Sequence, residues 1–480
     1  MFEYSSIEQY HAQLQDGSTT CVKAVEHYLE QIKNTRHLNA FVEVYAEEAL
    51  LKAKLLDAQR ASGNITGKLH GVVVGLKDVI AYKDHALTAS SNILKGFISL
   101  YSATAVEKLL AEEAIVIGRC NCDEFAMGST NENSAYGKVL NARDESRVPG
   151  GSSGGSAVAV QAGLCMISLG SDTGGSVRQP ADFCGIIGLK PTYGRISRHG
   201  LVAYASSFDQ IGVFGRTIAD IAITYEVIAG SDDFDSTLSL KAIDSWTTLS
   251  GDNKKYRIAW FNEALEHPSL DVEISTYIRA LLDKLRHDGH EVKPVPFELL
   301  DYVVPAYYVL TTAEASSNLS RYDGVKYGYR TNTNDSDITD FYKESRAEGF
   351  GTEVKRRIML GTFVLSSGYY DAYFTKAQKV RKLIREKIEL VFKEFDFILL
   401  PTSPSIAFKF GEKSDPIAMY LADIYTVMAN LTGIPAISLP LFWHNNGLGF
   451  GLQVMSTRFN EVHLLHFSNQ LMRDYKTNQV

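Results

Sequence analysis

Features that mark secreted, membrane and nucleic-acid-binding proteins are scarce in this sequence. Five cysteines in 480 residues are too few for a disulfide framework. Lysine and arginine number 48 against 56 acidic residues, a net charge of −8, so we do not expect the chain to hold nucleic acid or an anionic membrane unaided. The most apolar segment, residues 157–169, is interrupted by Gln161, Gly163 and Ser168, and it is shorter than the roughly 20 residues of a membrane span.

Signals for export and for metal binding are lacking as well. The first eight residues have neither a basic start nor an apolar stretch, so we expect no signal peptide, no membrane contact and a cytoplasmic location. The His-x-x-His pairs at 287/290 and 463/466 have no third ligand nearby, and the sequence therefore predicts no metal site.

An alternation of helical and strand patterns is what the sequence does contain. Apolar residues at helical spacing alternate with short β-branched runs near both ends of the chain, which predicts an α/β fold. Among the expected strands, residues 71–77 form a buried one that ends near Lys77. The expected helices are 5–14, 19–32, 47–61, 104–113, 153–163, 272–287, 342–360, 372–395 and 461–475, and the other expected strands are 114–118, 165–169, 397–400, 436–439 and 449–453.

We predict the domain organisation from the way residue composition and helical patterning change along the chain. Charged helical patterns dominate from about residue 231 to 395, and no Pro- or Ser-rich linker or repeat of solenoid length separates them from the rest. We therefore expect a single catalytic domain over residues 1–480, with a core at about 60–220 and 396–480 and a helical excursion at about 231–395.

A repeated tripeptide is the clearest local signal. Gly150-Gly151-Ser152 and Gly174-Gly175-Ser176 frame an expected helix and strand. Eleven helical residues advance about 16 Å and five strand residues return about 17 Å, so the second tripeptide can come back beside the first. A single Gly-Gly-Ser is common in loops and turns. Two copies around a compact helix–strand unit favour a shared site with two serines.

Two familiar motifs fit this region poorly. A phosphate-binding P-loop requires Lys where Ser156 stands. Residues 151–155 match the nucleophile elbow of α/β-hydrolases with Ser153 at its centre, but no convincing strand precedes them and no suitably placed His is found. Ser153 is expected to cap the helix that follows it.

Longer stretches carry a resemblance to a known family. Together they resemble the amidase signature family along its defining region, which implies an α/β/α sandwich around one mixed β-sheet. The stretches are 75–78, 150–157, 170–180, 188–195 and 207–212.

The resemblance implies a Ser–cis-Ser–Lys triad. It makes Ser176 the nucleophile that forms an acyl ester, Ser152 the bridging serine after a cis peptide bond, and Lys77 the base. It also implies an oxyanion hole built from backbone N–H groups of Thr173, Gly174, Gly175 and Ser176. Asp172 and Arg178, which flank this turn, are expected to form a structural ion pair.

The chemistry of Lys77 is compatible with that role. A serine hydroxyl is a weak nucleophile until something accepts its proton, and a lysine leaving an apolar strand is desolvated, which favours its neutral form. Lowering the pKa of a lysine from about 10.4 to about 7 corresponds to about 4.6 kcal/mol, which burial can supply. Without the resemblance, an exposed strand-end lysine would be the simpler interpretation.

Further segments extend the likeness to one subfamily, the glutaminase subunits of tRNA-dependent amidotransferases. These segments are 123–127, 313–319, 323–328, 353–357 and 366–371. The subfamily implies that Arg356 and Asp423 hold the two charged groups of glutamine, with Tyr307 alongside and the loop of Met127 and Ser129 lining the pocket.

The same likeness implies a division of labour in a heterotrimeric ligase of protein biosynthesis. This chain would hydrolyse glutamine without a cofactor and supply the ammonia. A tRNA-binding, kinase-type partner would use ATP and Mg²⁺ to amidate mischarged Glu-tRNA(Gln) or Asp-tRNA(Asn), and a small third subunit would wrap around this one. Contact with tRNA would fall mainly to the partner.

Other functions are compatible with part of the pattern. A free-standing amidase of the same family would keep the triad and need no partners. A non-catalytic assembly subunit would not need Lys77, Ser152 and Ser176. An esterase of the α/β-hydrolase type would use Ser153 instead of Ser176.

Overall fold

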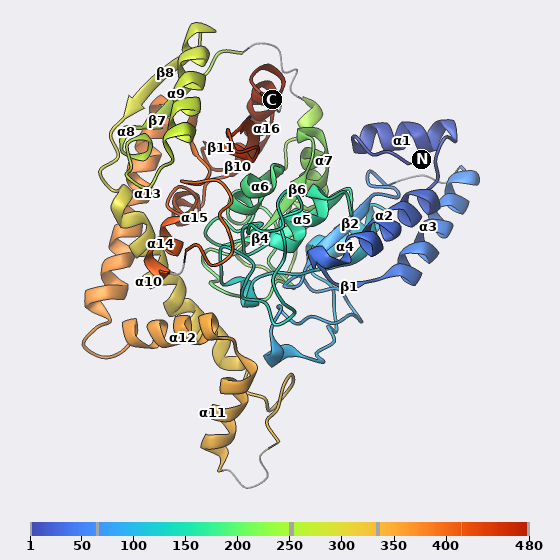
Figure 1. The fold of residues 1–480 in the computed structure, drawn as a ribbon, viewed down its shortest axis with the longest axis horizontal. Helices are drawn as coiled ribbons and strands as arrows, with labels where there is room; N and C mark the ends of the chain where they lie inside the picture. The colour runs from blue at the N-terminus through green and yellow to red at the C-terminus, as the bar shows by residue number, and fades with distance from the viewer. Residues whose placement is uncertain (1, 64–66, 249–253, 333–336, 414, 478–480) are drawn as a thin grey trace.

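A single mixed sheet of eleven strands organises the molecule (Figure 1). The computed structural model describes residues 2–63, 67–248, 254–332, 337–413 and 415–477. The strand order is β1-β3-β2-β4-β6-β5-β10-β11-β9-β7-β8. The strands are β1 (Phe41–Val44), β2 (Val73–Lys77), β3 (Ile115–Cys120), β4 (Ile167–Asp172), β5 (Ile187–Lys190), β6 (Gln210–Gly215), β7 (Arg257–Phe261), β8 (Glu291–Val295), β9 (Phe397–Pro401), β10 (Ala436–Trp443) and β11 (Gly449–Ser456).

Helices pack on this sheet and extend away from one of its ends. On the central strands, α5 packs with α6, and α7 packs with α16, which gives the α/β/α architecture expected from the sequence. The helices are α1 (Ile7–Asp16), α2 (Cys21–Asn34), α3 (Ala46–Ala61), α4 (Thr104–Ala111), α5 (Gly154–Gln161), α6 (Arg178–Cys184), α7 (Ile218–Ile228), α8 (Asn262–Leu265), α9 (Val272–His287), α10 (Leu300–Asn318), α11 (Ile338–Gly349), α12 (Thr352–Val364), α13 (Lys376–Glu394), α14 (Pro416–Leu421), α15 (Val427–Thr432) and α16 (Glu461–Asp474).

The third quarter of the chain is helical but also contributes to the sheet. It contains α9 to α13, as the charged helical patterns predict, and α11 projects far from the sheet (Figure 1). It also contains β7 and β8, two parallel strands that join the sheet through β9. The sequence analysis did not identify these two strands.

One expected helix is wrong in its extent. The predicted helix 342–360 is two helices, because α11 ends at Gly349 and α12 begins at Thr352. Between them, the N–H of Gly351 donates to the buried carboxylate of Glu124, and a side chain at Gly351 would collide with that carboxylate. A tertiary contact therefore interrupts a periodicity that is continuous in the sequence.

The central strands bring the ends of several segments to one edge of the sheet. β2 and β4 are parallel neighbours, so their carboxyl ends lie at the same edge, and these ends are Lys77 and Asp172. Both strands are buried along their whole length; β2 is apolar up to Lys77, as expected of a strand covered on both faces, whereas β4 also carries the buried polar residues Ser168, Ser171 and Asp172. Ser153 directly precedes α5, whose glycine-rich start lies against Asn121 and Ala40.

All five cysteines are buried free thiols. Among the described residues, no helix combines the length and apolar character needed to cross a membrane.

Candidate active site

Lys77 lies at the centre of a buried cluster of hydroxyl groups. Its Nζ atom is 2.7 Å from Ser152 Oγ, 2.9 Å from Ser153 Oγ and 2.8 Å from Ser171 Oγ. Ser153 Oγ donates its own proton to the carbonyl of Ser171 at 3.1 Å, so it can only accept from Lys77. The hydroxyls of Ser152 and Ser171 are free to donate or accept, and the cluster can therefore satisfy either an ammonium or a neutral amine.

Burial makes the neutral amine accessible near physiological pH. The side chain of Lys77 is fully buried, and desolvation lowers its pKa to about 8, although nearby groups including Asp123 and Asp172 oppose that shift. In the described chain no carboxylate forms an ion pair with it. The direction expected from the sequence is confirmed, since a lysine at the end of an apolar strand has lost its water without gaining a direct counter-ion.

The segment that carries Ser152 is held by buried polar groups. The peptide bond between Gly151 and Ser152 is cis, as the family resemblance implies. The carbonyl of Ser152 accepts the N–H of Asp123 at 3.0 Å, and the carboxylate of Asp123 accepts the N–H groups of Asn131 and Asn133 at 2.9 and 3.1 Å. These contacts hold the backbone that carries Ser152 in place.

The second tripeptide returns beside the first, as the matched helix and strand lengths predict. The N–H of Ser153 donates to the carbonyl of Ser176 at 3.3 Å. Ser176 is buried except for a small exposed fraction of 8%. Among the described residues, no hydrogen bond joins Ser152 Oγ to Ser176 Oγ.

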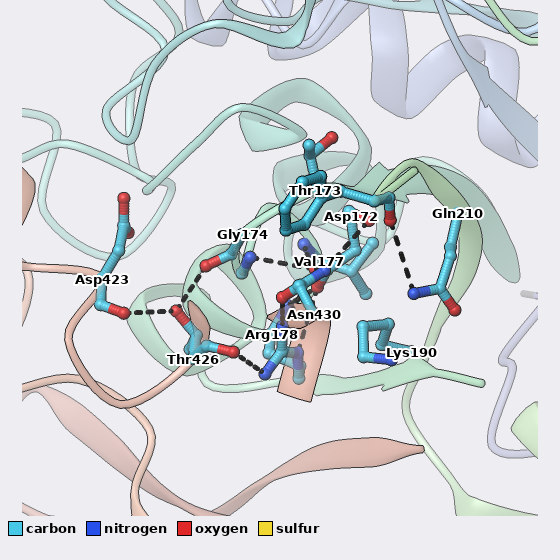
Figure 2. Close-up of polar contacts among 12 residues, drawn as sticks. Asp172, Thr173, Gly174, Val177, Arg178, Lys190, Gln210, Asp423, Thr426 and Asn430 are labelled. Carbon is cyan, nitrogen blue, oxygen red and sulfur yellow. Dashed lines mark hydrogen bonds and ion pairs between the residues drawn. The ribbon is translucent and has the colours of Figure 1, made fainter. Parts of the chain in front are cut away.

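Asp172 and Arg178 form the expected ion pair, and it anchors the turn between them. Arg178 Nη2 lies 2.9 Å from Asp172 Oδ1, with both side chains fully buried. Asn430 donates to the same carboxylate at 2.9 Å, and Arg178 also donates to the carbonyl of Thr426 at 2.7 Å (Figure 2). Burial alone would raise the pKa of Asp172, but the adjacent Arg178 guanidinium outweighs it and lowers the pKa to about 2.

The turn offers fewer oxyanion donors than the sequence indicates. The N–H of Gly175 donates to Asp172 Oδ1 at 2.9 Å, so it is not available to a substrate, and its inclusion in the expected oxyanion hole is corrected. Thr173, Gly174 and Ser176 are left as the candidate donors. Gly175 has φ +132°, and a Cβ there would lie 2.2 Å from Thr426 Oγ1, so both conformation and space require glycine.

The rest of the turn is positioned by residues far away in the sequence. Thr426 Oγ1 donates to the carbonyl of Gly174 at 2.7 Å, and Thr173 Oγ1 donates to Asp209 Oδ1 at 2.7 Å. The ring of Tyr307 packs against Gly174, where an added Cβ would lie 2.5 Å from it. Tyr307 is itself buried, so it closes the turn from the side of α10.

A cavity of about 260 Å³ lies beside this cluster. Two of the predicted pocket residues, Ser129 and Arg356, line it. Gln179 connects it to the serines, because its Nε2 donates to the carbonyl of Ser129 at 3.0 Å and its Oε1 accepts the N–H of Gly151 at 2.9 Å. Met127 is fully buried and lies just before the lining residues Gly128 and Ser129, so its side chain supports the wall rather than lining it.

Of the two predicted charged residues, Arg356 lines the cavity, whereas Asp423 does not line it and is connected to it through Ser129. Ser129 Oγ donates to Asp423 Oδ2 at 2.7 Å, and burial raises the pKa of Asp423 to about 7. Arg356 is partly exposed and forms an ion pair with Glu353. The structure thus brings Ser129 and Asp423 into contact and places Arg356 on the same cavity.

The sequence analysis gave Ser153 a role that the structure does not show, and it did not identify Ser171 or Arg357. Ser153 occupies the N-cap position of α5, but its hydroxyl makes no capping hydrogen bond; that prediction is wrong because the hydroxyl is bound to Lys77 and Ser171. Arg357 is buried, donates to Tyr204 Oη at 2.8 Å and lies over the rings of Tyr308 and Tyr420. Only Ser171 carried a usable signal, since it is a polar residue near the end of a buried strand.

Glu124 connects the two walls of the cavity. Its carboxylate accepts the N–H of Gly351, the residue before α12, at 2.9 Å and is also hydrogen-bonded by Ser91. It therefore holds the helix that carries Arg356 against the loop that carries Ser129. Burial raises the pKa of Glu124 to about 7.

Metal ligands are not grouped in this region or elsewhere in the described residues. No three His, Cys, Asp or Glu side chains of that part of the chain lie where they could hold a metal ion together.

Comparison with known proteins gives a consistent set of relatives. The family model described as Amidase matches residues 23–465. The chain is 48% identical to a glutamyl-tRNA(Gln) amidotransferase subunit of Chlorobium luteolum over 478 residues, covering 98% of this chain and 97% of that one. The crystal structure of the corresponding glutamyl-tRNA(Gln) amidotransferase subunit from Thermotoga maritima is similar with TM-score 0.80 and 38% identity, covering 99% and 95% of the two chains. A native peptide amidase from Stenotrophomonas maltophilia is similar with TM-score 0.84 and 26% identity, covering 99% and 97%.

The buried ion pair leads to a prediction about stability. Replacing Asp172 by Ala leaves the Arg178 guanidinium buried without its carboxylate, so we expect a loss of about 3–5 kcal/mol in the free energy of unfolding. Urea unfolding followed by circular dichroism measures it. As a control, Asp283→Ala removes an exposed ion pair with Arg286 and should cost about 1 kcal/mol or less; equal effects of the two substitutions would contradict the anchoring role of Asp172.

Proposed function

This chain belongs to the Amidase family, and from that premise we propose that it cleaves a carboxamide with Ser176 as nucleophile, Ser152 as bridging proton carrier and Lys77 as base. The observation that carries the proposal is the contact of 2.7 Å between Lys77 Nζ and Ser152 Oγ. This contact joins Lys77, whose pKa is lowered, to Ser152. The residue that follows Ser152, Ser153, is hydrogen-bonded to the carbonyl of Ser176.

The proposed reaction begins with two coupled proton transfers. Neutral Lys77 accepts the proton of Ser152 while Ser152 accepts that of Ser176, whose oxygen attacks the carbonyl carbon of the amide. The hydroxyl of Ser176 must turn toward Ser152 for this step, and such contacts commonly tighten only when substrate is bound. The proton on Lys77 then returns through Ser152 to the leaving nitrogen, so ammonia departs and an acyl ester stays on Ser176.

Water completes the proposed cycle. It attacks the ester carbonyl while its proton follows the same path to Lys77, and the collapse of the intermediate returns a proton to Ser176 Oγ and releases the acid. The oxyanion that forms in both halves is stabilised by backbone N–H groups of Thr173, Gly174 and Ser176, each donor being worth several kcal/mol.

Glutamine is the proposed amide. Its α-ammonium and α-carboxylate groups need an anion and a cation at fixed positions, and Asp423 and Arg356 supply these charges next to the 260 Å³ cavity. Tyr307, between the oxyanion turn and this region, and Ser129, which is bound to Asp423, complete the pocket. The identity of 48% with the glutamyl-tRNA(Gln) amidotransferase subunit of Chlorobium luteolum supports this substrate over a simple aryl amide.

The same relatives support a role as one subunit of a tRNA-dependent amidotransferase. In this proposal the ammonia released at Ser176 is used by a partner subunit that activates the glutamyl group of Glu-tRNA(Gln), or the aspartyl group of Asp-tRNA(Asn), with ATP and Mg²⁺. A small third subunit completes the assembly. The chain itself holds the amidase chemistry, and its net charge of −8 fits a subunit whose partner makes most of the contact with tRNA.

The first prediction about activity concerns the nucleophile. Ser176→Ala and Lys77→Ala should each lower ammonia release from glutamine by about three orders of magnitude or more, while Ser320→Ala, an exposed serine, should leave it unchanged. Intact-mass analysis of a quenched reaction should detect an acyl adduct that disappears in Ser176→Ala.

Comparison of substrates separates this proposal from its alternatives. Wild type should prefer glutamine over asparagine and an aryl amide, whereas a preference for the aryl amide would indicate a free-standing amidase. Full activity of Ser176→Ala with loss in Ser153→Ala would indicate the esterase mechanism, and near-normal turnover of Lys77→Ala would contradict the proposed base.

The second prediction concerns pH. Lys77 must be neutral to accept a proton, and its pKa is about 8, so turnover at saturating glutamine should rise about ten-fold per pH unit below that value and level off above it. Lys77→Arg should be inactive at every pH because a guanidinium stays protonated. A pH-independent turnover between 6 and 9 in wild type, with the fold checked by circular dichroism, would contradict the assignment.

The third prediction concerns the glutamine pocket. Asp423→Asn and Arg356→Gln should each raise the KM for glutamine about ten-fold or more, since each removes a charge-assisted contact, and should affect an aryl amide less. Lys355→Gln makes the same charge change on α12 outside the cavity and should leave the KM unchanged. An unaltered KM in both pocket variants would remove the assignment.

A further inference from the structure

A second cavity, beside α13, carries cations that the amide chemistry does not use. Its volume is about 440 Å³, and its charged lining residues are Arg381, Lys382, Arg385 and Arg458. It shares no lining residue with the cavity beside Ser129. The volume lies within the range of about 300–1,000 Å³ that is typical of small-molecule sites.

Two distant parts of the chain supply these cations. Three of them occupy one face of α13, since Arg381, Lys382 and Arg385 are spaced by one and three residues. Arg458 follows β11 and approaches from another segment. Like charges four residues apart, such as Arg381 and Arg385, destabilise a helix by a few tenths of a kcal/mol, and on the outer side of α13 the ion pair between Arg385 and Glu389 offsets part of that cost.

The inner cations contact neutral groups directly, and the carboxylate of Glu314 acts on Arg381 only through the hydroxyl of Ser207. Arg381 donates to the carbonyl of Leu431 and to the hydroxyl and carbonyl of Ser207, each at 3.0 Å, and it lies over the ring of Phe208. The Nε of Arg458 is buried without a hydrogen-bond partner. Both guanidiniums are thus held in place with their charge uncompensated by a direct ion pair in the described residues.

The acidic residues nearby lie outside the cavity. Lys382 and Arg385 pair with Glu386 and Glu389 on the exposed surface of α13, and no Asp or Glu is among the described residues that line the cavity. Burial, with a further contribution from the charge of Arg385, lowers the pKa of Arg458, and the charge of Glu389 opposes that shift. The cations therefore repel one another across an opening that an anion could fill.

We propose that this cavity binds a small phosphorylated anion of the pyrophosphate or nucleoside-polyphosphate class. The cations approach from different segments, and a tetrahedral phosphate presents oxygens in several directions, whereas the two oxygens of a carboxylate lie in one plane. Guanidinium forks match phosphate oxygens pairwise. Four cations suit a ligand with more than one anionic group. The site goes beyond the proposed amide hydrolysis and does not depend on it.

Isothermal titration calorimetry of the full chain with pyrophosphate, ATP and citrate tests the site. We expect saturable one-to-one binding of pyrophosphate or ATP, tighter than that of citrate and weakened by added salt. Equal affinities for pyrophosphate and ATP would indicate recognition of the phosphates alone, and tighter ATP would indicate contacts to the nucleoside; both support the site.

Matched variants separate a built site from general charge attraction. Arg385→Gln and Arg458→Gln should each weaken binding about ten-fold or more, whereas Lys379→Gln, an exposed lysine of α13 outside the cavity, should change it less than two-fold. Arg385 is half exposed, so its variant is expected to fold. Absence of saturable binding at millimolar pyrophosphate and ATP, tighter binding of citrate, or an equal loss in Lys379→Gln would overturn the proposal. Glutamine hydrolysis is measured in parallel, so either result is independent of the amide chemistry.

Discussion

Lys77 is fully buried, and its amine contacts three serine hydroxyls instead of a carboxylate. Hydroxyls can accept from an ammonium and can also donate to a neutral amine, so this environment permits both protonation states. A carboxylate in direct contact would favour the ammonium and raise its pKa. β2, β4 and the start of α5 surround Lys77. They exclude water from its amine and also supply its hydrogen-bond partners.

The Asp172–Arg178 pair extends this organisation to the rest of the molecule. Asp172 uses its oxygens to shape the turn that ends in Ser176, while Arg178 reaches Thr426 and Asn430 around α15. The turn is thereby tied to a segment about 250 residues later in the chain. A backbone N–H that points at a developing charge must be held in advance, and a buried ion pair with several further hydrogen bonds provides that rigidity.

Local patterns predicted some of the elements because periodicity and strand composition are local properties, but α6, α10, α15, β5 and β6 around the site were not among them. The predicted helix 272–287 and the predicted strand that ends at Lys77 agree with α9 and β2, since an amphipathic pattern and a β-branched run can be recognised from the sequence alone. The joint at Gly351 and the role of Ser153 were not predictable in this way. Each depends on a partner far along the chain, Glu124 in one case and Lys77 in the other.

The sequence by itself determined the fold class and the family and predicted the three site residues Lys77, Ser152 and Ser176, because these are carried by contiguous motifs and by matched lengths of helix and strand. Tertiary structure alone decided which groups are free to act. It committed the N–H of Gly175 to Asp172 and joined Ser129 to Asp423 across 294 positions. It also buried Arg357 while leaving its neighbour Arg356 partly exposed, although both line the cavity. Adjacent residues of one type differ in role because burial and hydrogen-bond partners are set by packing between distant segments.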